Sequence, residues 1–86
     1  MECYKIEWRK STKKDLRKIS SIDILRIISA VEVLSKNPYP QGVRKLSGSE
    51  STYRIRIGNY RVIYEVFEHT IVIEIQRVRH RKDVYQ

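Results

Sequence analysis

The chain opens on a short stretch whose polarity alternates. From Cys3 to Trp8 apolar side chains are separated by charged ones, which is the period of a half-buried β-strand. The next segment predicts a short basic helix, N-capped by Ser11 or Thr12, with Asp15 in its first turn, where the helix dipole favours a carboxylate. An N-terminal strand is therefore expected to lead directly into a helix.

A second and stronger helix follows, which we expect Ser20 or Ser21 to cap. Its apolar residues recur at three-residue spacing, with others between them, and predict a broad buried face. The positions expected to cover the core are Ile22, Ile24, Leu25, Ile27, Ile28, Ala30, Val31 and Leu34. Pro38 disfavours helical geometry at Asn37 and ends the helix, and an exposed polar loop is expected through about Ser51.

The second half of the chain reads as an antiparallel hairpin. Two alternating segments, Tyr53–Ile57 and Tyr60–Val66, flank Gly58-Asn59, a two-residue turn of the primed type. Because the turn fixes the register, facing residues can be assigned. The predicted pairs are Ile57 with Tyr60, Arg56 with Arg61, Ile55 with Val62, Arg54 with Ile63, and Tyr53 with Tyr64. Two arginines thus face each other directly, which is unfavourable unless an anion binds there.

A further strand is expected after a turn near Glu68-His69. Its isoleucines Ile71, Ile73 and Ile75 would lie on the core face, with Glu74 and Gln76 on the arginine face beside Ile63 and Arg61. These elements predict an α+β fold in a single domain, residues 1–86. In this fold an N-terminal strand and a two-helix hairpin accompany a mainly antiparallel four-stranded sheet, and the helices pack on one face of that sheet.

Length and composition narrow the class of protein. The chain has 86 residues and 18 Lys and Arg against 10 Asp and Glu, a net charge of +8. The helical segments are too short and too often interrupted by polar residues for a membrane span, and the N-terminus lacks the pattern of an export signal, so a cytoplasmic location is expected. One cysteine, Cys3, and two histidines fill neither a disulfide nor a structural zinc site, and we expect no metal and no cofactor.

The arginines suggest the chemical nature of the ligand. A guanidinium group binds phosphate through two parallel hydrogen bonds, and clustered arginines near aromatic residues point to a polyanion, nucleic acid foremost. The cations expected to meet it in the last third of the chain are Arg54, Arg56, Arg61, Arg77, Arg79, Arg81 and Lys82.

Metal-free cleavage of RNA is one chemistry that such a face can perform. It needs a base for the 2′-hydroxyl proton, cations for the charge that develops on the phosphate, and an acid for the departing 5′-oxygen. Arginine serves only the second task, because its pKa is too high for proton transfer at neutral pH. Protons would pass through His80, Tyr85 or a carboxylate, of which Glu65 and Glu74 are candidates if they share the face. Strand glutamates more commonly neutralise neighbouring arginines.

Three segments in order carry a resemblance to a known family. They are Leu46-x-Gly48, the hairpin YRIRIGNYRVIYEV from Tyr53 to Val66, and VRHRKDVY from Val78 to Tyr85. Together with the leading strand and helical hairpin, this pattern resembles the RelE/ParE toxin superfamily, and within it the RelE-type mRNA interferases of toxin–antitoxin systems. The resemblance implies a toxin that enters the A site of the 70S ribosome, contacts rRNA there, cleaves the bound mRNA by 2′-hydroxyl attack, and is neutralised by a cognate antitoxin.

The resemblance also implies roles for individual residues. Arg61 and Arg81 match arginines that bind phosphate and stabilise the transition state, and Tyr85 matches a C-terminal tyrosine that stacks on or helps activate the substrate. Arg54 and Arg56 replace two lysines of the best-known members. An arginine is a poor substitute for a lysine acting as general base, which directs attention to His80 as the proton-transfer group.

Two other functions remain open. ParE-type toxins, which bind DNA gyrase without catalysis, share this fold and much of the hairpin pattern. The segment from His80 to Tyr85 favours the interferase over that alternative. A third possibility is a degenerate toxin that only binds RNA or its antitoxin.

Overall fold

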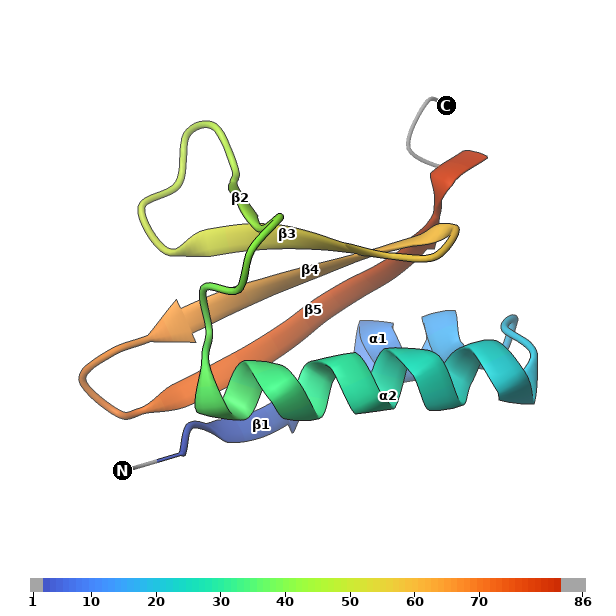
Figure 1. Cartoon of the computed structure of the whole chain (residues 1–86), viewed down its shortest axis with the longest axis horizontal. Coiled ribbons are helices and arrows are strands. Elements are labelled where there is room, and N and C mark those ends of the chain that lie inside the picture. The colour runs from blue at the N-terminus through green and yellow to red at the C-terminus, as the bar shows by residue number, and fades with distance from the viewer. Residues whose placement is uncertain (1–2, 83–86) are drawn as a thin grey trace.

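The computed structural model describes residues 3–82, which form a five-stranded mixed sheet and two helices (Figure 1). The elements are β1 (Lys5–Trp8), α1 (Lys10–Leu16), α2 (Ser21–Lys36), β2 (Arg44–Lys45), β3 (Thr52–Ile57), β4 (Tyr60–Phe67) and β5 (Val72–His80). The strand order is β1-β5-β4-β3-β2, in which β1 pairs parallel with β5 and the other neighbours are antiparallel. The predicted α+β class and mainly antiparallel sheet are confirmed.

The predicted number of four strands is wrong. The fifth strand, β2, is only two residues long and lies in the segment expected to be a loop. Its residues Arg44 and Lys45 pair with Arg54 and Tyr53 of β3. Two residues show no recognisable alternation, so this strand exists through its pairing with a neighbour and not through a local pattern.

Helix α2 covers one face of the sheet, and the expected cap is present at Ser20, whose hydroxyl accepts the Asp23 N–H at 3.4 Å. The expected apolar face is only partly buried, because Ile22 and Leu25 are 67% and 66% exposed. A strict three-residue repeat rotates by about 60° per step around an α-helix, so its first members turn away from a core that its last members meet.

The core lies between α2 and the sheet. Its buried residues are Ile27, Val31 and Leu34 from α2, Val62, Tyr64 and Val66 from β4, and Ile73, Ile75 and Val78 from β5. The Tyr64 hydroxyl donates to the Pro38 carbonyl at 2.7 Å, which ties the loop after α2 to the central strand. Ile73 and Ile75 are buried as predicted, whereas Ile71 precedes β5 and has a φ of 56°.

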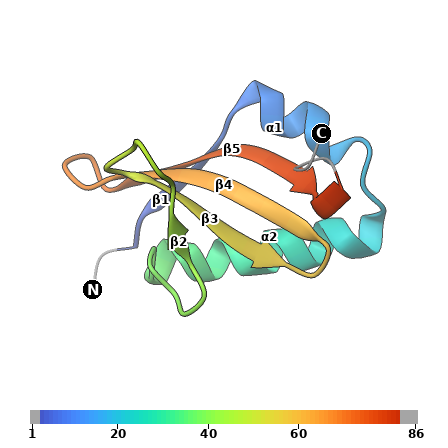
Figure 2. The same ribbon diagram turned by 90° about the horizontal axis from the view of Figure 1, so that it is seen from above.

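Helix α1 runs beside β5 (Figure 2), where β1 has ended. The predicted caps are wrong, because α1 begins at Lys10 after Arg9, and Ser11 and Thr12 lie inside it. Their hydroxyls donate instead to β5, from Thr12 to the Ile75 carbonyl at 2.6 Å and from Ser11 to the Gln76 carbonyl at 2.9 Å. These side chains therefore satisfy the open edge of a strand and not the first turn of their own helix.

The Gly58-Asn59 hairpin has the predicted register in all five pairs. The next ladder contains a bulge, because Tyr64 pairs with Ile75 and Ile63 with Arg77, which leaves Gln76 as an extra residue. Gln76 lies on the arginine face as expected but beside Glu65, not beside Ile63 and Arg61. The bulge also reverses the alternation of β5, so that Val78 joins the core while Arg77 and Arg79 face outward.

Candidate functional site

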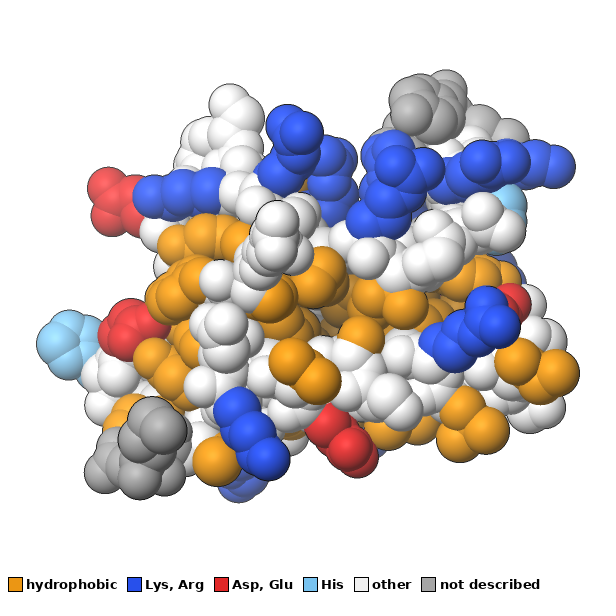
Figure 3. Space-filling view, in the orientation of Figure 1, with side chains coloured by type: hydrophobic (Ala, Val, Ile, Leu, Met, Phe, Trp, Pro, Cys, Tyr) orange, Lys and Arg blue, Asp and Glu red, His pale blue; other side chains and the backbone are white. Residues whose placement is uncertain are grey.

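The face of the sheet opposite α2 carries two cross-strand rows of arginine. Residues that pair directly across a sheet point to the same side, so the register assigns each row. The first row is Arg56, Arg61 and Arg79, on β3, β4 and β5. The second row is Arg44, Arg54, Ile63 and Arg77, on β2 to β5. We call this surface, with its six arginines, the arginine face; Lys and Arg side chains gather along that side of the molecule (Figure 3).

The arginine face is hollowed in two adjoining places. One hollow, of about 360 Å³, is lined by Gln41, Gly42, Arg44, Arg54, Ile55, Arg56 and Arg61. The other, of about 260 Å³, is lined by Arg56, Arg61, Arg81 and Lys82. Because Arg56 and Arg61 line both, the two hollows form one trough, which we call the arginine groove. It runs from the loop after α2, across β2, β3 and β4, to the end of β5.

The groove brings together five residues that the sequence pointed to: Arg54, Arg56, Arg61, Arg81 and Lys82. The Arg81 backbone N–H donates to the Asn59 carbonyl at 2.8 Å, so the hairpin turn holds the start of the C-terminal segment against the groove. Such an array of guanidinium groups binds phosphates and stabilises charge that develops on them.

Arg44 is a groove residue that the sequence did not reveal. It lies on the unpredicted strand β2, opposite Arg54. Its neighbour Gly42 has a φ of 90°, a left-handed conformation that favours glycine, and open space lies where a Cβ would be. The only signal in the sequence was a basic pair, Arg44-Lys45, after a proline-containing loop.

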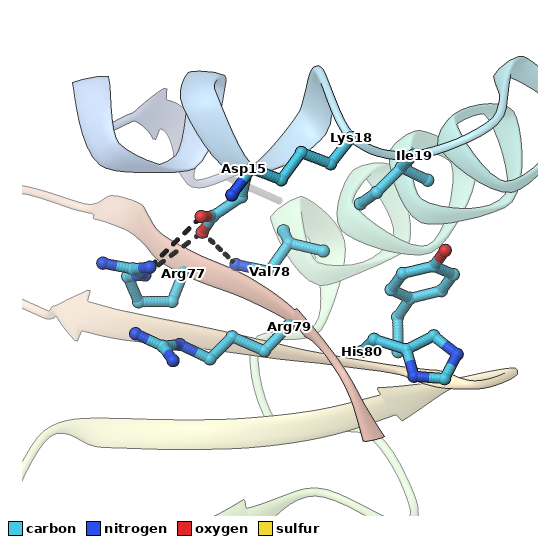
Figure 4. A pocket seen from close by; sticks show the side chains of 8 residues that line it. Asp15, Lys18, Ile19, Arg77, Val78, Arg79 and His80 are labelled. Atoms are coloured by element: carbon cyan, nitrogen blue, oxygen red, sulfur yellow. Dashed lines mark hydrogen bonds and ion pairs between the residues drawn. The ribbon is translucent and has the colours of Figure 1, made fainter. Parts of the chain in front are cut away.

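Arg77 and Arg79 lie on the arginine face but line neither hollow of the groove. Figure 4 shows their side chains on β5. The Arg77 Nη2 atom donates to Asp15 Oδ1 at 3.2 Å, and its Nε atom lies 3.1 Å from Oδ2 without the alignment of a hydrogen bond. Asp15 Oδ2 also accepts the Val78 backbone N–H at 3.0 Å. Arg77 is therefore neutralised by α1, whereas Arg79 forms no ion pair within residues 3–82.

His80 points to the other side of β5 (Figure 4). Its ring meets the ring of Tyr60 edge to face, with centroids 5.2 Å apart, and its Nδ1 atom accepts the Lys82 backbone N–H at 3.2 Å. A hollow of about 490 Å³ lies there, lined by Asp15, Lys18, Ile19, Tyr60, Arg77, Val78, Arg79 and His80. The structure thus does not bring the His80 ring together with Arg61, and its role in proton transfer stays a prediction.

Tyr85 lies outside the described residues, and its role likewise stays a prediction. The two candidate carboxylates are described, and both share the arginine face as the sequence allowed. Glu65 and Glu74 pair across β4 and β5, and the Gln76 amide donates to both, at 2.9 and 3.0 Å. Glu74 also accepts a hydrogen bond from Arg9 at 2.8 Å. These acids form a patch at the far end of the strands, separated from Arg61 along β4 by Ile63.

A second polar cluster lies away from the groove. The hydroxyls of Tyr39 and Tyr4 both donate to the Glu68 carboxylate, and the Tyr39 ring packs edge to face on Tyr53. These two hydrogen bonds hold the pKa of Glu68 below its ordinary value, that of Tyr39 being the larger cause. Burial, followed by the bond to Glu68, raises the pKa of Tyr39. The cluster therefore ties the loop after α2 to the β4–β5 turn.

Within residues 3–82, no three His, Cys, Asp or Glu side chains gather in a way that could hold a metal ion. Neither α1 nor α2 combines the length and hydropathy of a membrane-spanning helix.

The fold is shared with a class of small toxins. The model of the ParE toxin family of type II toxin–antitoxin systems matches residues 6–85. The match covers nearly the whole chain, and the protein therefore belongs to this family. The resemblance to the RelE/ParE superfamily is confirmed.

Relatives and solved structures place the chain on the RelE side of the superfamily. Toxin RelE3 of Methanocaldococcus jannaschii is 35% identical, over 94% of each chain. The RelE chain of the RelE-RelB complex from Pyrococcus horikoshii has 31% identity and a TM-score of 0.82, covering 92% of this chain and 96% of that one. The RelB-RelE antitoxin-toxin complex from Methanococcus jannaschii matches with 30% identity and a TM-score of 0.75, covering 92% and 94%.

Proposed function

We propose that this protein is a ribosome-dependent mRNA interferase, a toxin that cleaves the mRNA in the ribosomal A site and so stops translation and growth. The arginine groove is the observation that carries the proposal. It gathers Arg54, Arg56, Arg61 and Arg81 in one trough, where a phosphate can meet several guanidinium groups at once. The similarity to RelE toxins supports the same function.

The proposed reaction needs no metal ion. The 2′-oxygen of one nucleotide attacks the adjacent phosphorus, the bond from phosphorus to the 5′-oxygen of the next nucleotide breaks, and a 2′,3′-cyclic phosphate remains on the upstream fragment. A base takes the 2′-hydroxyl proton and an acid returns one to the departing 5′-oxygen. Arg61 and Arg81 would stabilise the extra negative charge on the phosphate, and Arg54 and Arg56 would hold the flanking chain.

Protons require a different group, because arginine stays charged at neutral pH. His80 and Tyr85 are the candidates on the C-terminal segment. His80, the last residue of β5, pairs with Tyr60 and so lies on the opposite face of the sheet from Arg61; it would serve only if the end of β5 rearranged when RNA binds. Arg77, Arg79 and Lys82 would contact RNA or rRNA outside the scissile phosphate.

A cognate antitoxin is the expected partner. The solved complexes contain RelE together with RelB, and we propose an equivalent partner here. A carboxylate-rich antitoxin segment would suit the arginine groove. In the cytoplasm, such binding would hold the toxin inactive until the antitoxin is lost.

Inhibition of DNA gyrase is the second candidate function. Its support is that the matching family model is that of the ParE toxin. In this case the arginine face would bind a protein or DNA and perform no chemistry. The two candidates make different predictions for RNA in growing cells.

The test is a short pulse of expression in bacteria, followed by mapping of mRNA 5′ ends against the reading frame. Wild type is compared with Arg81→Ala and Tyr85→Ala, and with Arg17→Ala as a control that removes an exposed charge at the end of α1. Cuts at a fixed codon position, lost in the first two variants and kept in the control, are expected. Growth arrest with DNA breaks and no such cuts would favour gyrase and reject the interferase.

A further inference from the structure

The arginine groove extends beyond the arginines that would surround the scissile phosphate. Arg56, Arg61 and Arg81 lie around one hollow, whereas Arg44 and Arg54 lie in the adjoining one. Arg54 is two residues from Arg56 along β3, a distance of about 6.8 Å, close to the spacing of successive phosphates in single-stranded nucleic acid. Arg44 faces Arg54 across the β2–β3 ladder.

The Arg44 end of the groove has the character of an anion site. Within residues 3–82, neither Arg44 nor Arg54 forms an ion pair with a carboxylate. Arg44 is exposed on a two-residue strand and faces Arg54, so among the described residues its guanidinium lies beside a like charge with no carboxylate paired to it. Two adjacent cations of this kind are unfavourable in the free protein and favourable around a phosphate.

Negative charge closes the other route across this face. A strand of RNA that followed β4 or β5 away from Arg61 would meet Glu65 and Glu74, which lie side by side. Repulsion between these carboxylates and phosphates disfavours that path. The path across β3 to β2 stays positive over its whole length, and it ends at the hollow beside Gln41 and Gly42.

We therefore infer a second phosphate subsite formed by Arg44 and Arg54, which binds the nucleotide next to the one held at Arg56, Arg61 and Arg81. The Gln41 side chain, at the end of the same hollow, brings an amide that can bond a base edge or a ribose. The inference rests on the proposed function in taking RNA as the ligand. It assigns to Arg44 a role in holding substrate and none in the chemistry.

Binding of short RNAs to the purified toxin tests this subsite. The probes are 2′-O-methyl RNAs, which lack the attacking hydroxyl: a trinucleotide and an oligonucleotide of about nine residues. Arg44→Ala is expected to weaken binding of the longer probe about tenfold and to reduce the dependence of log K on log salt by about 0.7, one phosphate contact on a single strand. Affinity for the trinucleotide should change less than about twofold, because the central hollow alone can hold it.

Lys45→Ala is the matched control. Lys45 lies next to Arg44 on β2 and pairs with Tyr53, so its side chain belongs to the opposite face. The Lys45→Ala substitution removes one positive charge from the same strand and should leave the affinities for both probes nearly unchanged. Arg44→Lys should restore part of the longer probe's affinity. Because both residues are exposed, melting curves are expected to match wild type.

Three outcomes would overturn the subsite. The first is an equal loss of affinity in Arg44→Ala and Lys45→Ala. The second is an equal loss of affinity for the two probes in Arg44→Ala, and the third is no binding of either probe to wild type. Cleavage in cells decides the proposed function separately. In-frame cuts in cells, with no greater loss of affinity for the longer probe in Arg44→Ala, would support the interferase function and reject the subsite. A greater loss of affinity for the longer probe in Arg44→Ala, without cuts in cells, would support the subsite and reject the interferase function.

Discussion

The two faces of the same three strands, β3 to β5, follow opposite physical rules. On the face toward α2, apolar side chains such as Val62 and Ile75 are fully buried, and the hydroxyl of the equally buried Tyr64 has a partner in the Pro38 carbonyl. On the arginine face, like charges stand directly opposite one another. Burial and satisfied hydrogen bonds stabilise the first face. On the second face, hydrogen bonds and ion pairs such as that of Arg77 with Asp15 lie at its margins, and the direct pairing of Arg56 with Arg61 and of Arg44 with Arg54 adds no burial of this kind.

The comparison separates residues that serve folding from residues that we propose bind RNA. Arg61 has an arginine on each side, Arg56 on β3 and Arg79 on β5, and Arg44 faces Arg54. A like-charged cross-strand pair is unfavourable by about 0.2–1 kcal/mol. A phosphate chain reverses the sign of each such contact. Substitutions on the two faces should therefore change stability and activity independently.

The largest effect is expected on the helix-covered face. Leu34→Ala removes a fully buried side chain of α2 and should lower the free energy of unfolding by about 2–5 kcal/mol, through lost burial and the cavity left behind. Urea denaturation measures it. Val33→Ala is the control, because Val33 is the adjacent residue and is 57% exposed. A loss below about 1 kcal/mol for Leu34→Ala would place the core elsewhere.

The converse is expected on the arginine face. Arg81→Ala should lower ribosome-dependent cleavage by about 100-fold or more, since it removes one of the cations proposed to stabilise charge on the phosphate. Its free energy of unfolding should stay within about 0.5 kcal/mol of wild type, because the side chain is exposed and the backbone bond to Asn59 remains. Cleavage of programmed ribosomes and urea denaturation measure the two quantities. If Arg81→Ala lowered both the cleavage and the free energy of unfolding, the two faces would not act independently.

Asp15 of α1 contacts residues of both faces. It accepts hydrogen bonds from Arg77, on the arginine face, and from the backbone N–H of Val78, whose side chain lies in the core. Asp15→Ala should lower the free energy of unfolding by about 1–2 kcal/mol, since it removes the acceptor of both the Val78 N–H and Arg77. Arg77→Gln should have a smaller effect, below about 1 kcal/mol, because it keeps the backbone bond and removes only a partly exposed ion pair. Equal losses in the two variants would assign the whole effect to the ion pair.

A gain in stability is the next expectation. Arg56→Gln relieves repulsion with Arg61 and should raise the free energy of unfolding by about 0.2–1 kcal/mol at low salt. The gain should shrink as salt screens the charges. Lys45→Gln, which removes a charge from the opposite face, should give no comparable gain. A salt-independent change would have to arise from packing.

The sequence predicted those features that are set locally. The Gly58-Asn59 turn fixed five pairs of the β3–β4 ladder, including Arg56 with Arg61, because a two-residue turn leaves one register. Other features depend on contacts between distant segments. The two residues of β2 become a strand only beside β3, and Ser11 and Thr12 serve β5 instead of their own helix. Local patterns carry no record of such partners.

The bulge explains what the sequence missed at the site. Strict alternation from Ile75 would place Arg79 in the core, and a single extra residue, Gln76, moves it opposite Arg61. The same shift sends His80 to the side of Tyr60, away from the arginines. Residues near the hairpin were therefore placed correctly from the sequence, whereas Gln76, expected beside Ile63 and Arg61, lies beside Glu65.

The smallest expected effect concerns acid. The pKa of Glu68 is lowered in the folded protein by hydrogen bonds from Tyr39 and Tyr4, so its charged form favours folding. This contribution is present above the ordinary pKa of a glutamate and is lost as pH falls through the lower folded value. The melting temperature of Glu68→Gln should therefore fall less than that of wild type when the pH is lowered from 6 to below about 4.5.

Glu50→Gln is the matched control, because Glu50 is an exposed acid outside the tyrosine cluster. It should follow the wild-type acid profile, whereas Tyr39→Phe, which removes the stronger of the two donors, should resemble Glu68→Gln. The arginine face supplies the contrast, since Arg56→Gln changes no group that titrates in this range and should shift the whole profile without altering its slope. A wild-type slope in Glu68→Gln would remove the cluster from the acid response and leave only the general repulsion among cations.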